Sequence, residues 1–268
     1  MKTTLITGAS GGIGEALASR FAARKHNLLL VARNAAKLKA QCQQLAAQFG
    51  IDAQYIAADL ALPTAPADIF TEVQRRGLEV DVLINNAGIG SGGEFSQLAL
   101  EAELHLIQLN ITALVALTHL LLPPMQARRS GVLVNVASMA ALMPVPYMAT
   151  YAASKAFVRS FTEALTEECK PHNVRVLLLL PGLTKTNFNE AAGLVGGIGK
   201  GLNTEYTSAT QTPEQVADEA LKALDAGKQV VISGSLNRLG AKLLALVPNA
   251  VTAKRMASSY RQKMGLLT

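Results

Sequence analysis

Near its start the chain reads TTLITGASGGIG over residues 3–14. The β-prone run Thr3–Thr7 passes directly into a turn with glycines at positions 8, 12 and 14, where a helical pattern begins. Glycine lets such a turn bend tightly and lets a diphosphate approach the backbone, while the N-terminus of a helix offers free N–H groups and a favourable dipole. The spacing is Gly-x3-Gly-x-Gly instead of the commonest dinucleotide fingerprint, Gly-x-Gly-x-x-Gly. Its place between a first strand and a first helix still predicts a dinucleotide-binding turn.

Short apolar runs alternate with helical patterns along the rest of the chain. The run Val174–Leu180 is almost continuously apolar, as in parallel sheets whose two faces are both covered. We therefore predict an α/β fold, a doubly wound Rossmann fold with a seven-stranded parallel sheet and helices on both faces. Ligands of such sheets bind at the carboxyl ends of the strands. The expected strands are Thr3–Thr7, Leu28–Ala32, Ala53–Ala58, Val82–Ile84, Val132–Ala137, Val174–Leu180 and Val230–Ile232, and the expected helices are Gly12–Arg24, Ala35–Phe49, Ala65–Arg76, Glu101–Arg128, Tyr151–Lys170 and Pro213–Ala226.

No linker divides the chain, so we expect a single Rossmann-fold domain over residues 1–268 with its core at 1–233. The loosest stretch is 193–209, within a segment at 187–212, and it has glycines at positions 193, 196, 197, 199 and 201. A disordered insertion and a mobile substrate loop over the active edge both fit this composition. Residues 234–268 form a basic, apolar helical tail.

Composition narrows the class of protein. Half of the 268 residues are hydrophobic, enough for a sizeable core. Cys42 and Cys169 lack metal-ligand spacing, so we expect reduced, buried thiols and no metal. The start of the chain has no apolar leader and no apolar run approaches the length of a membrane span, which predicts a cytoplasmic protein.

The net charge of +6 is concentrated near the C-terminus. No acidic residue follows Asp225, whereas seven basic residues do, which leaves 18 basic against 19 acidic residues in the rest of the chain. Aromatic residues are few and no recognition motif appears, so we expect no nucleic-acid partner. A helical pattern of apolar residues, interspersed with Arg238 and Lys242, ends at Pro248. Such a helix can lie on an anionic membrane surface, close a substrate pocket or pack on another subunit; its apolar residues are Leu236, Leu239, Leu243, Leu246 and Val247.

Tyr151 and Lys155 form a candidate proton-transfer pair. Residues four apart share a helix face, and a cation beside a phenol lowers the pKa of the phenol from about 10 toward neutrality. Ser138, which follows a separate strand, can hold a carbonyl oxygen in front of that phenol. Tyr147 is not an equivalent candidate, because the residue four positions later is Tyr151 instead of a lysine.

The end of the second strand predicts which dinucleotide binds. An NAD site usually has an Asp or Glu here to hold the ribose 2′-hydroxyl, but this chain has Ala32 and then Arg33. An arginine attracts a 2′-phosphate and can bind it through two hydrogen bonds, so we expect NADP(H), with NAD(H) as the alternative.

These residues together resemble the short-chain dehydrogenase/reductase family. The resemblance rests on Thr7–Gly14, Asp59, Asn85–Gly88, Asn110, Ser138, Tyr151, Lys155 and Pro181-Gly182, in the family's order and spacing. It implies that Tyr151 exchanges the proton, Ser138 binds the substrate oxygen and Lys155 lowers the pKa of the tyrosine and holds the nicotinamide ribose. It also implies that Asn110 anchors a water that leads from Lys155 to solvent. The cofactor contacts that it implies, beyond Arg33, Tyr151 and Lys155, are Gly8, Ser10, Gly12, Ile13, Asp59, Leu60, Asn86, Ala87, Gly88, Pro181, Gly182, Thr184 and Thr186.

The expected activity is that of an NADP(H)-dependent oxidoreductase acting on a carbonyl or secondary alcohol. Two alternatives stay open: a catalytically silent NADP-sensing protein, and an epimerase or dehydratase on a related fold. The apolar helix stretch Ile111–Leu122 and the family resemblance predict a homodimer or homotetramer. The candidate pocket residues are largely apolar, which indicates a hydrophobic substrate; they are Ala140, Met143, Val145, Tyr147, Leu183, Phe188 and Leu194.

Overall fold

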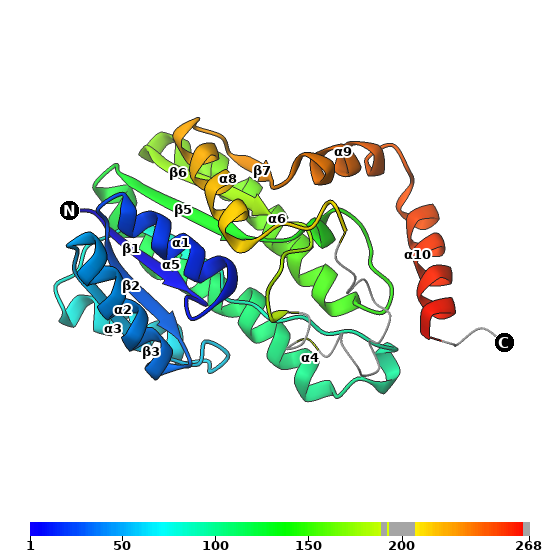
Figure 1. Cartoon of the computed structure of the whole chain (residues 1–268), viewed down its shortest axis with the longest axis horizontal. Coiled ribbons are helices and arrows are strands. Elements are labelled where there is room, and N and C mark those ends of the chain that lie inside the picture. Colours follow the sequence, from blue (N-terminus) through cyan, green and yellow to red (C-terminus); the bar gives the residue numbers. More distant parts are fainter. Residues whose placement is uncertain (189–191, 193–206, 265–268) are drawn as a thin grey trace.

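The sheet has seven parallel strands in the order β3-β2-β1-β4-β5-β6-β7 (Figure 1). The computed structural model describes residues 1–188, 192 and 207–264. The order reverses between β1 and β4, and ligands of doubly wound sheets bind at such a reversal. The predicted fold class is confirmed. The strands are β1 Thr3–Thr7, β2 Asn27–Ala32, β3 Ala53–Ala57, β4 Val80–Asn85, β5 Gly131–Val136, β6 Val174–Leu180 and β7 Val230–Ile232.

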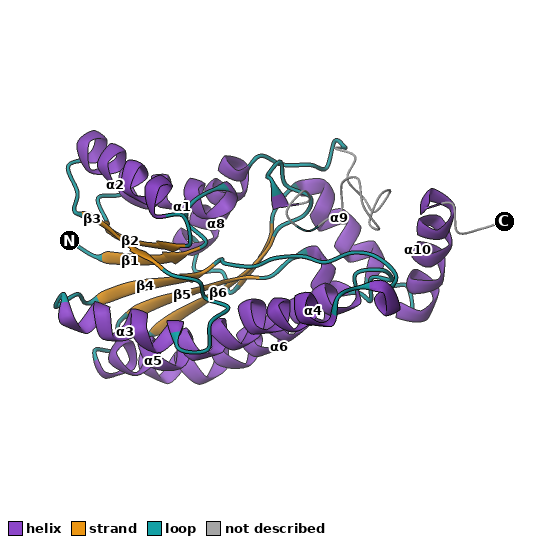
Figure 2. Ribbon diagram, turned by 90° about the horizontal axis from the view of Figure 1, so that it is seen from below, coloured by secondary structure: helices purple, strands orange, loops and turns teal. Residues whose placement is uncertain are grey.

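Helices cover both faces of the sheet. Successive side chains along each strand point to opposite faces, so each strand packs against both helical layers. In β1, for example, Ile6 packs with α1, α2 and α8, whereas Leu5 packs with α3, α5 and α6. Figure 2 shows these two layers above and below the strands. The helices are α1 Gly12–Ala23, α2 Ala35–Phe49, α3 Ala65–Arg75, α4 Leu100–Ile107, α5 Ala113–Ala127, α6 Ala149–Cys169, α8 Pro213–Asp225, α9 Ser235–Leu244 and α10 Asn249–Met264.

Two helical segments differ from the sequence prediction. The helix expected over 101–128 is divided by a π-helical turn, Gln108–Thr112, between α4 and α5. The tail contains a second helix, α10, after Pro248, which the apolar spacing of α9 did not reveal because α10 is mostly polar. Both tail helices lie beyond the carboxyl ends of the strands, at the opposite end of the molecule from the N-terminus (Figure 1).

The stretch Leu100–Ala127 is, among the described residues, a helical span long and apolar enough to cross a membrane by length and composition, with a mean hydropathy of 1.7. In the fold its side chains Leu117, Leu121 and Met125 pack into the core beneath the sheet. The same stretch therefore serves as a core helix here.

A buried polar network joins the sheet to this helical layer. Asn85 on β4 donates to Asn135 on β5 at 2.9 Å and to Thr118 on α5 at 3.0 Å, and Asn135 donates to Thr162 on α6 at 3.0 Å. Buried amides without partners would be costly, so these bonds fix the helices relative to the carboxyl ends of two central strands.

Candidate active site

The glycine turn is shaped by close backbone contacts. Gly8 and Gly12 have φ angles of 64° and 57°, in the left-handed region that favours glycine. A Cβ atom at Gly14 would overlap the Gly8 carbonyl oxygen, and one at Gly8 would lie 2.9 Å from the Ala87 Cα atom. The turn therefore packs directly on the end of β4, with the N-terminus of α1 beside it.

Hydrogen bonds of Asn86 and Thr7 hold the glycine turn against the end of β4. The Asn86 side chain donates to the carbonyls of Thr7 and Gly8 at 3.0 and 3.2 Å. The Thr7 hydroxyl in turn accepts hydrogen bonds from the backbone N–H groups of Asn86 and Ala87, both at 3.0 Å. Asn86 therefore shapes the glycine turn itself, in addition to being a predicted cofactor contact.

The segment after β6 reaches the same place. The Thr186 methyl group lies 3.0 Å from the position of a Cβ atom at Gly12. Thr184 donates to the Gly182 carbonyl at 3.0 Å, and the Pro181 carbonyl accepts from the Met139 N–H at 2.9 Å. The structure thus brings Thr186, one of the predicted contacts after β6, beside the predicted diphosphate turn. Of the other predicted contacts here, Ser10 and Ile13 are half-buried members of the turn and the start of α1.

The end of the candidate site next to β2 and β3 is polar. Arg33 follows β2, is exposed, and has no hydrogen-bond or ion-pair partner among the described residues. Asp59 accepts a hydrogen bond from the Ala61 N–H at 3.1 Å and so stabilises a turn, with Leu60 buried beside it. A free guanidinium at this end fits a phosphate on the adenosine ribose.

Tyr151 and Lys155 lie on the buried side of α6, and the Lys155 Nζ atom is 6.0 Å from the Tyr151 ring centroid. The ammonium donates to the Val136 carbonyl at 3.1 Å. Burial lowers the pKa of Lys155 to about 8. Burial also raises the pKa of Tyr151, while a hydrogen bond with Ser138 opposes that rise. The sequence predicted a lowered tyrosine pKa, but in the structure the desolvation of the buried phenol is the largest influence, and the pKa of Tyr151 is raised.

Asn110 sits in the π-helical turn and is 1% exposed. Its side chain accepts from the Ile89 N–H and donates to the Ile89 carbonyl, both at 2.9 Å. It also donates to the Ser154 hydroxyl at 3.0 Å. A Cβ atom at Gly88 would lie 3.1 Å from the Asn110 Oδ1 atom and 3.2 Å from the Lys155 Nζ atom, so all three meet here. π-Helical turns often occur at functional sites. The position of a polar asparagine within an apolar helix was the sequence signal for a role of Asn110, whereas nothing in the sequence marked Ser154.

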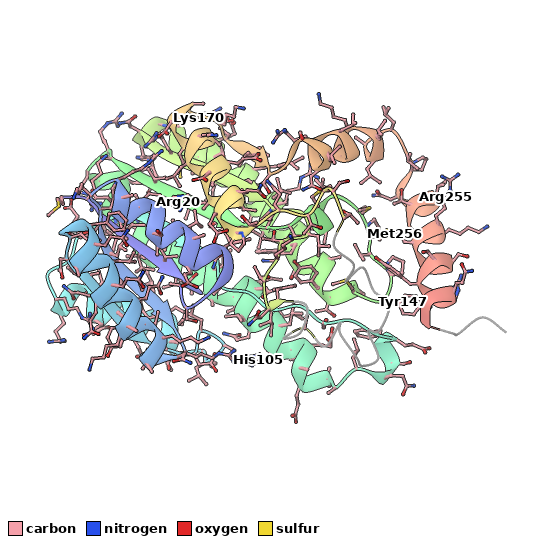
Figure 3. The ribbon with its side chains drawn as sticks, viewed as in Figure 1. Arg20, His105, Tyr147, Lys170, Arg255 and Met256 are labelled. Carbon is pink, nitrogen blue, oxygen red and sulfur yellow. The ribbon has the colours of Figure 1, made fainter. Side chains whose placement is uncertain are left out.

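Tyr151 packs within an apolar cluster. Phe188 packs against the Tyr151 ring at 5.5 Å between centroids. Tyr260 and Met256 reach the cluster from α10, and Tyr260 meets Tyr147 edge-to-face at 6.4 Å; Figure 3 shows Tyr147 beside α10. Of the predicted pocket residues, the cluster includes Ala140, Met143, Val145, Tyr147 and Phe188; Leu183 is not a member, and Leu194, like the glycines of the predicted lid, lies outside the described residues.

The members of this cluster form an apolar wall against Tyr151. Three of them, Tyr260, Met256 and Ile89, could not be identified from the sequence. Tyr260 is only 3% exposed although it lies near the end of the chain. No sequence signal distinguished it, because contact between α10 and the 140s loop depends on the turn at Pro248.

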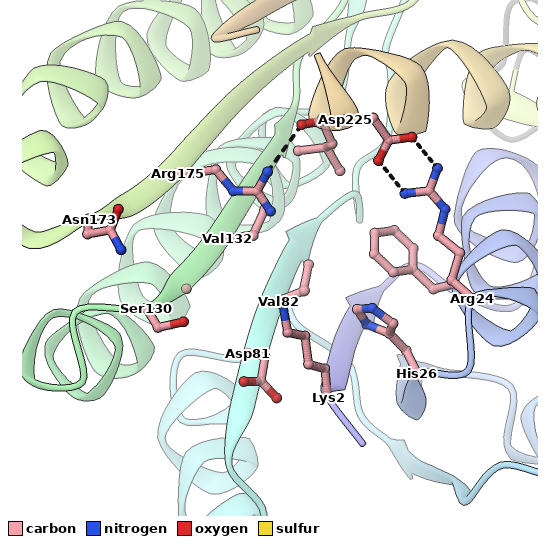
Figure 4. Close-up of a pocket in the computed structure, with 13 residues that line it drawn as sticks. Lys2, Arg24, His26, Asp81, Val82, Ser130, Val132, Asn173, Arg175 and Asp225 are labelled. Atoms are coloured by element: carbon pink, nitrogen blue, oxygen red, sulfur yellow. Dashed lines mark hydrogen bonds and ion pairs between the residues drawn. The ribbon is translucent and has the colours of Figure 1, made fainter. Parts of the chain in front are cut away.

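A separate cavity of about 390 Å³ lies at the amino ends of the strands, away from Tyr151 (Figure 4). Most of its charged side chains already have partners: Arg24 pairs with Asp225 at 2.6 Å, Arg175 donates to the Leu224 carbonyl at 3.2 Å, and Asp81 accepts from the Thr3 N–H at 2.7 Å. His26 is bonded to the Thr4 hydroxyl at 2.7 Å. These groups stabilise the sheet edge and offer little unpaired polarity to a ligand.

Comparison with known proteins identifies the family. The family model for short chain dehydrogenases matches residues 2–194. Dehydrogenase/reductase SDR family member 7B of Bos taurus is 34% identical over 97% of this chain and 81% of its own. A short-chain dehydrogenase from Sphingobium yanoikuyae, solved with NADPH, is 34% identical with a TM-score of 0.79 over 87% of each chain. A bulky-bulky ketone specific alcohol dehydrogenase from Comamonas testosteroni is 29% identical with a TM-score of 0.76, over 93% of this chain and 96% of its own.

The chain belongs to the short-chain dehydrogenase/reductase family. The predicted resemblance and the predicted enzyme class, an oxidoreductase acting on alcohol or carbonyl groups, are confirmed. The described residues also fit a dinucleotide: the left-handed glycines leave the turn open, Thr186 adjoins it, and Arg33 has a free guanidinium.

Replacing Gly14 with alanine tests the close packing of the turn. The new Cβ atom would overlap the Gly8 carbonyl, so Gly14→Ala should lower the free energy of unfolding by about 1–3 kcal/mol and weaken NADPH binding. Urea denaturation and fluorescence titration with NADPH measure the two effects. Gly11→Ala is the matched control, because a Cβ atom there meets nothing within 4 Å. Equal behaviour of the two variants would contradict this account of the turn.

Proposed function

We propose that this enzyme is an NADP(H)-dependent reductase of a hydrophobic ketone, with Tyr151 as the proton donor. The observation that carries the proposal is the meeting of Tyr151, Lys155 and Ser138 at the carboxyl edge of the sheet, beside the glycine turn. A catalytically silent NADP sensor is disfavoured, since none of the groups that the chemistry needs is missing. A related epimerase or dehydratase is disfavoured because the family match covers most of the chain.

Each residue has a distinct task in this proposal. NADPH, when bound, supplies the hydride. Ser138 hydrogen-bonds the substrate carbonyl, and Tyr151 gives its proton to that oxygen as negative charge develops. The raised pKa of Tyr151 keeps the phenol protonated at neutral pH, as a proton donor requires. Lys155 supplies positive charge beside the phenol. Asn110, bonded to both backbone groups of Ile89, anchors the polar path behind Lys155.

NADP(H) is proposed over NAD(H) because of Arg33. No carboxylate lies at the end of β2 to accept a hydrogen bond from a ribose hydroxyl. The exposed guanidinium of Arg33 attracts a phosphate instead. The solved relative from Sphingobium yanoikuyae contains NADPH, which supports the same choice. Ser10-Gly11 in the turn carries no second cation, so Arg33 bears most of this preference.

The proposed substrate is a ketone with an apolar body on each side. The wall over Tyr151 is built from aromatic and aliphatic side chains, including Phe188 and Tyr260. The Comamonas testosteroni relative is specific for bulky-bulky ketones, which supports this size class.

We also propose a cytoplasmic homodimer or homotetramer. The outward side of α4 exposes Leu100, Leu104 and Ile107, at 68, 54 and 39%, and Phe157 on α6 is 40% exposed. Such apolar residues at helical spacing suit a subunit contact.

Removing the Tyr151 hydroxyl should abolish turnover. Tyr151→Phe keeps the ring against Phe188, so NADPH should still bind, but kcat should fall by about 10²- to 10⁴-fold because the proton donor is lost. Ketone reduction followed at the NADPH absorbance measures this. Tyr147→Phe, on the same wall, should stay near wild type. Wild-type turnover by Tyr151→Phe would refute the proposed mechanism.

The rate should fall as Lys155 loses its proton. Its pKa of about 8 means that the cation is present below that pH and lost above it. Consequently kcat/KM for NADPH, which reports groups of the free enzyme, should decline above about pH 8. In Lys155→Arg the charge persists, so any remaining activity should decline at a higher pH. A wild-type profile that stays level through this range would contradict the assignment.

Arg33→Ala should weaken NADPH binding selectively. Loss of charge-assisted hydrogen bonds to a 2′-phosphate should raise the dissociation constant for NADPH by about 10- to 100-fold and leave that for NADH nearly unchanged. Fluorescence titration with both nucleotides measures the ratio. Lys39→Ala on α2 is the control. Equal weakening of both nucleotides would show that Arg33 does not read the phosphate.

Tyr260→Ala should alter substrate size preference. Because Tyr260 is 3% exposed within the wall, its loss should lower kcat/KM for large hydrophobic ketones by about tenfold and affect small ketones little. A ketone series of increasing size measures this, with the exposed Ser259→Ala as the control. A uniform loss across the series would place Tyr260 outside the substrate site.

A further inference from the structure

We infer that the outer face of α9 docks on an anionic membrane surface. This inference goes beyond the proposed reaction and rests on an apolar stripe that the fold leaves uncovered. The residues of this α9 stripe are Leu236, Leu239, Leu243, Leu246 and Val247, which are 48, 56, 58, 82 and 36% exposed.

The stripe has a fixed orientation. Leu236, Leu239 and Leu243 recur three or four residues apart on α9 and so share one side of the helix, and Leu246 and Val247 lie in the turn that follows it. The other side is anchored: Asn237 is 7% exposed, donates to the Ser233 carbonyl at 2.8 Å and packs against Gly182, and Ala241 is 9% exposed. Because α9 is held by this inner side, the stripe faces outward in the folded chain.

The charge around the stripe complements an anionic surface. No acidic residue follows Asp225 in the sequence. Arg238 is paired with Glu219 at 2.6 Å, but Lys242 on α9 is exposed and has no partner in the described part of the chain. Lys254 and Arg255 on α10 are likewise exposed and unpaired there, and Figure 3 shows Arg255 at the outer side of that helix. Apolar residues on one side of a helix with lysines and arginines beside them are typical of helices that lie in a membrane interface.

A second copy of the chain fits the α9 stripe less well than an anionic membrane does. A symmetric contact through α9 would bring the same unpaired lysines and arginines together, with no carboxylate in either tail to neutralise them. The exposed apolar side of α4 differs, because the exposed carboxylate of Glu101 lies next to Leu100. That surface would be repelled by anionic lipid, so it supplies a matched control.

Docking would place lipid close to the proposed substrate wall. The same tail continues into α10, which contributes Tyr260 and Met256 to that wall. A hydrophobic ketone dissolved in the bilayer would then be near the site that reduces it.

Flotation of the full-length enzyme with vesicles tests the inference. The protein should float with phosphatidylcholine vesicles that contain phosphatidylglycerol and stay unbound with phosphatidylcholine alone. The double variant Leu239→Glu/Leu243→Glu should lower the bound fraction about tenfold or more, whereas Leu104→Glu on α4 should not. Lys242→Ala/Lys254→Ala/Arg255→Ala, which leaves the stripe intact, should also reduce binding and make the remainder more sensitive to salt.

Ketone turnover in solution reports folding, and it is expected to persist in all of these variants. Absence of wild-type flotation, or equal flotation with uncharged vesicles, would overturn the inference while leaving the proposed reaction intact. If the α9 double variant changed the elution volume on a sizing column while wild type failed to float, the stripe would instead be a subunit contact.

Discussion

The Asn86 carboxamide, which donates to the carbonyls of Thr7 and Gly8, holds together everything that the site requires. It joins the ends of β1 and β4, where the strand order reverses. The glycine turn is pressed against Ala87 by this junction, and Gly88, two residues on, meets both Asn110 and Lys155. The glycine turn and Lys155 of the proposed proton-transfer pair therefore both lie against the segment that ends β4.

Burial shifts the pKa values of Tyr151 and Lys155 in opposite directions. An apolar wall raises the pKa of the phenol, and the same burial lowers the pKa of Lys155, so both groups are held closer to neutral forms. Polar contacts counter this effect locally: Ser138 beside the phenol, and the Val136 carbonyl beside the ammonium. The candidate site thus combines an apolar surface with a few hydrogen bonds at the two groups of the proposed proton transfer.

Much of the fold and most of the candidate site could be predicted from the sequence, because these features are local. The apolar run of β6 and the glycine turn after β1 can each be predicted from a few consecutive residues. Tyr151 and Lys155 needed only the helix period. The π-helical turn, the contact of Tyr260 with Tyr147 and the direction of the Tyr151 pKa could not be predicted in this way. Each depends on which distant elements pack together and on how much water they exclude, and no short pattern encodes that.

The burial of Tyr260 near the end of the chain has a consequence for biosynthesis. The sheet begins at Thr3 and closes with Ile232, so the glycine turn and the proton-transfer pair are translated well before α10. Domains generally acquire structure from the amino-terminal side during synthesis. The apolar cluster against Tyr151 is completed only after α10 is synthesised, so a chain terminated before α10 would retain the strands and the glycine turn but lack Tyr260 and Met256 of that cluster.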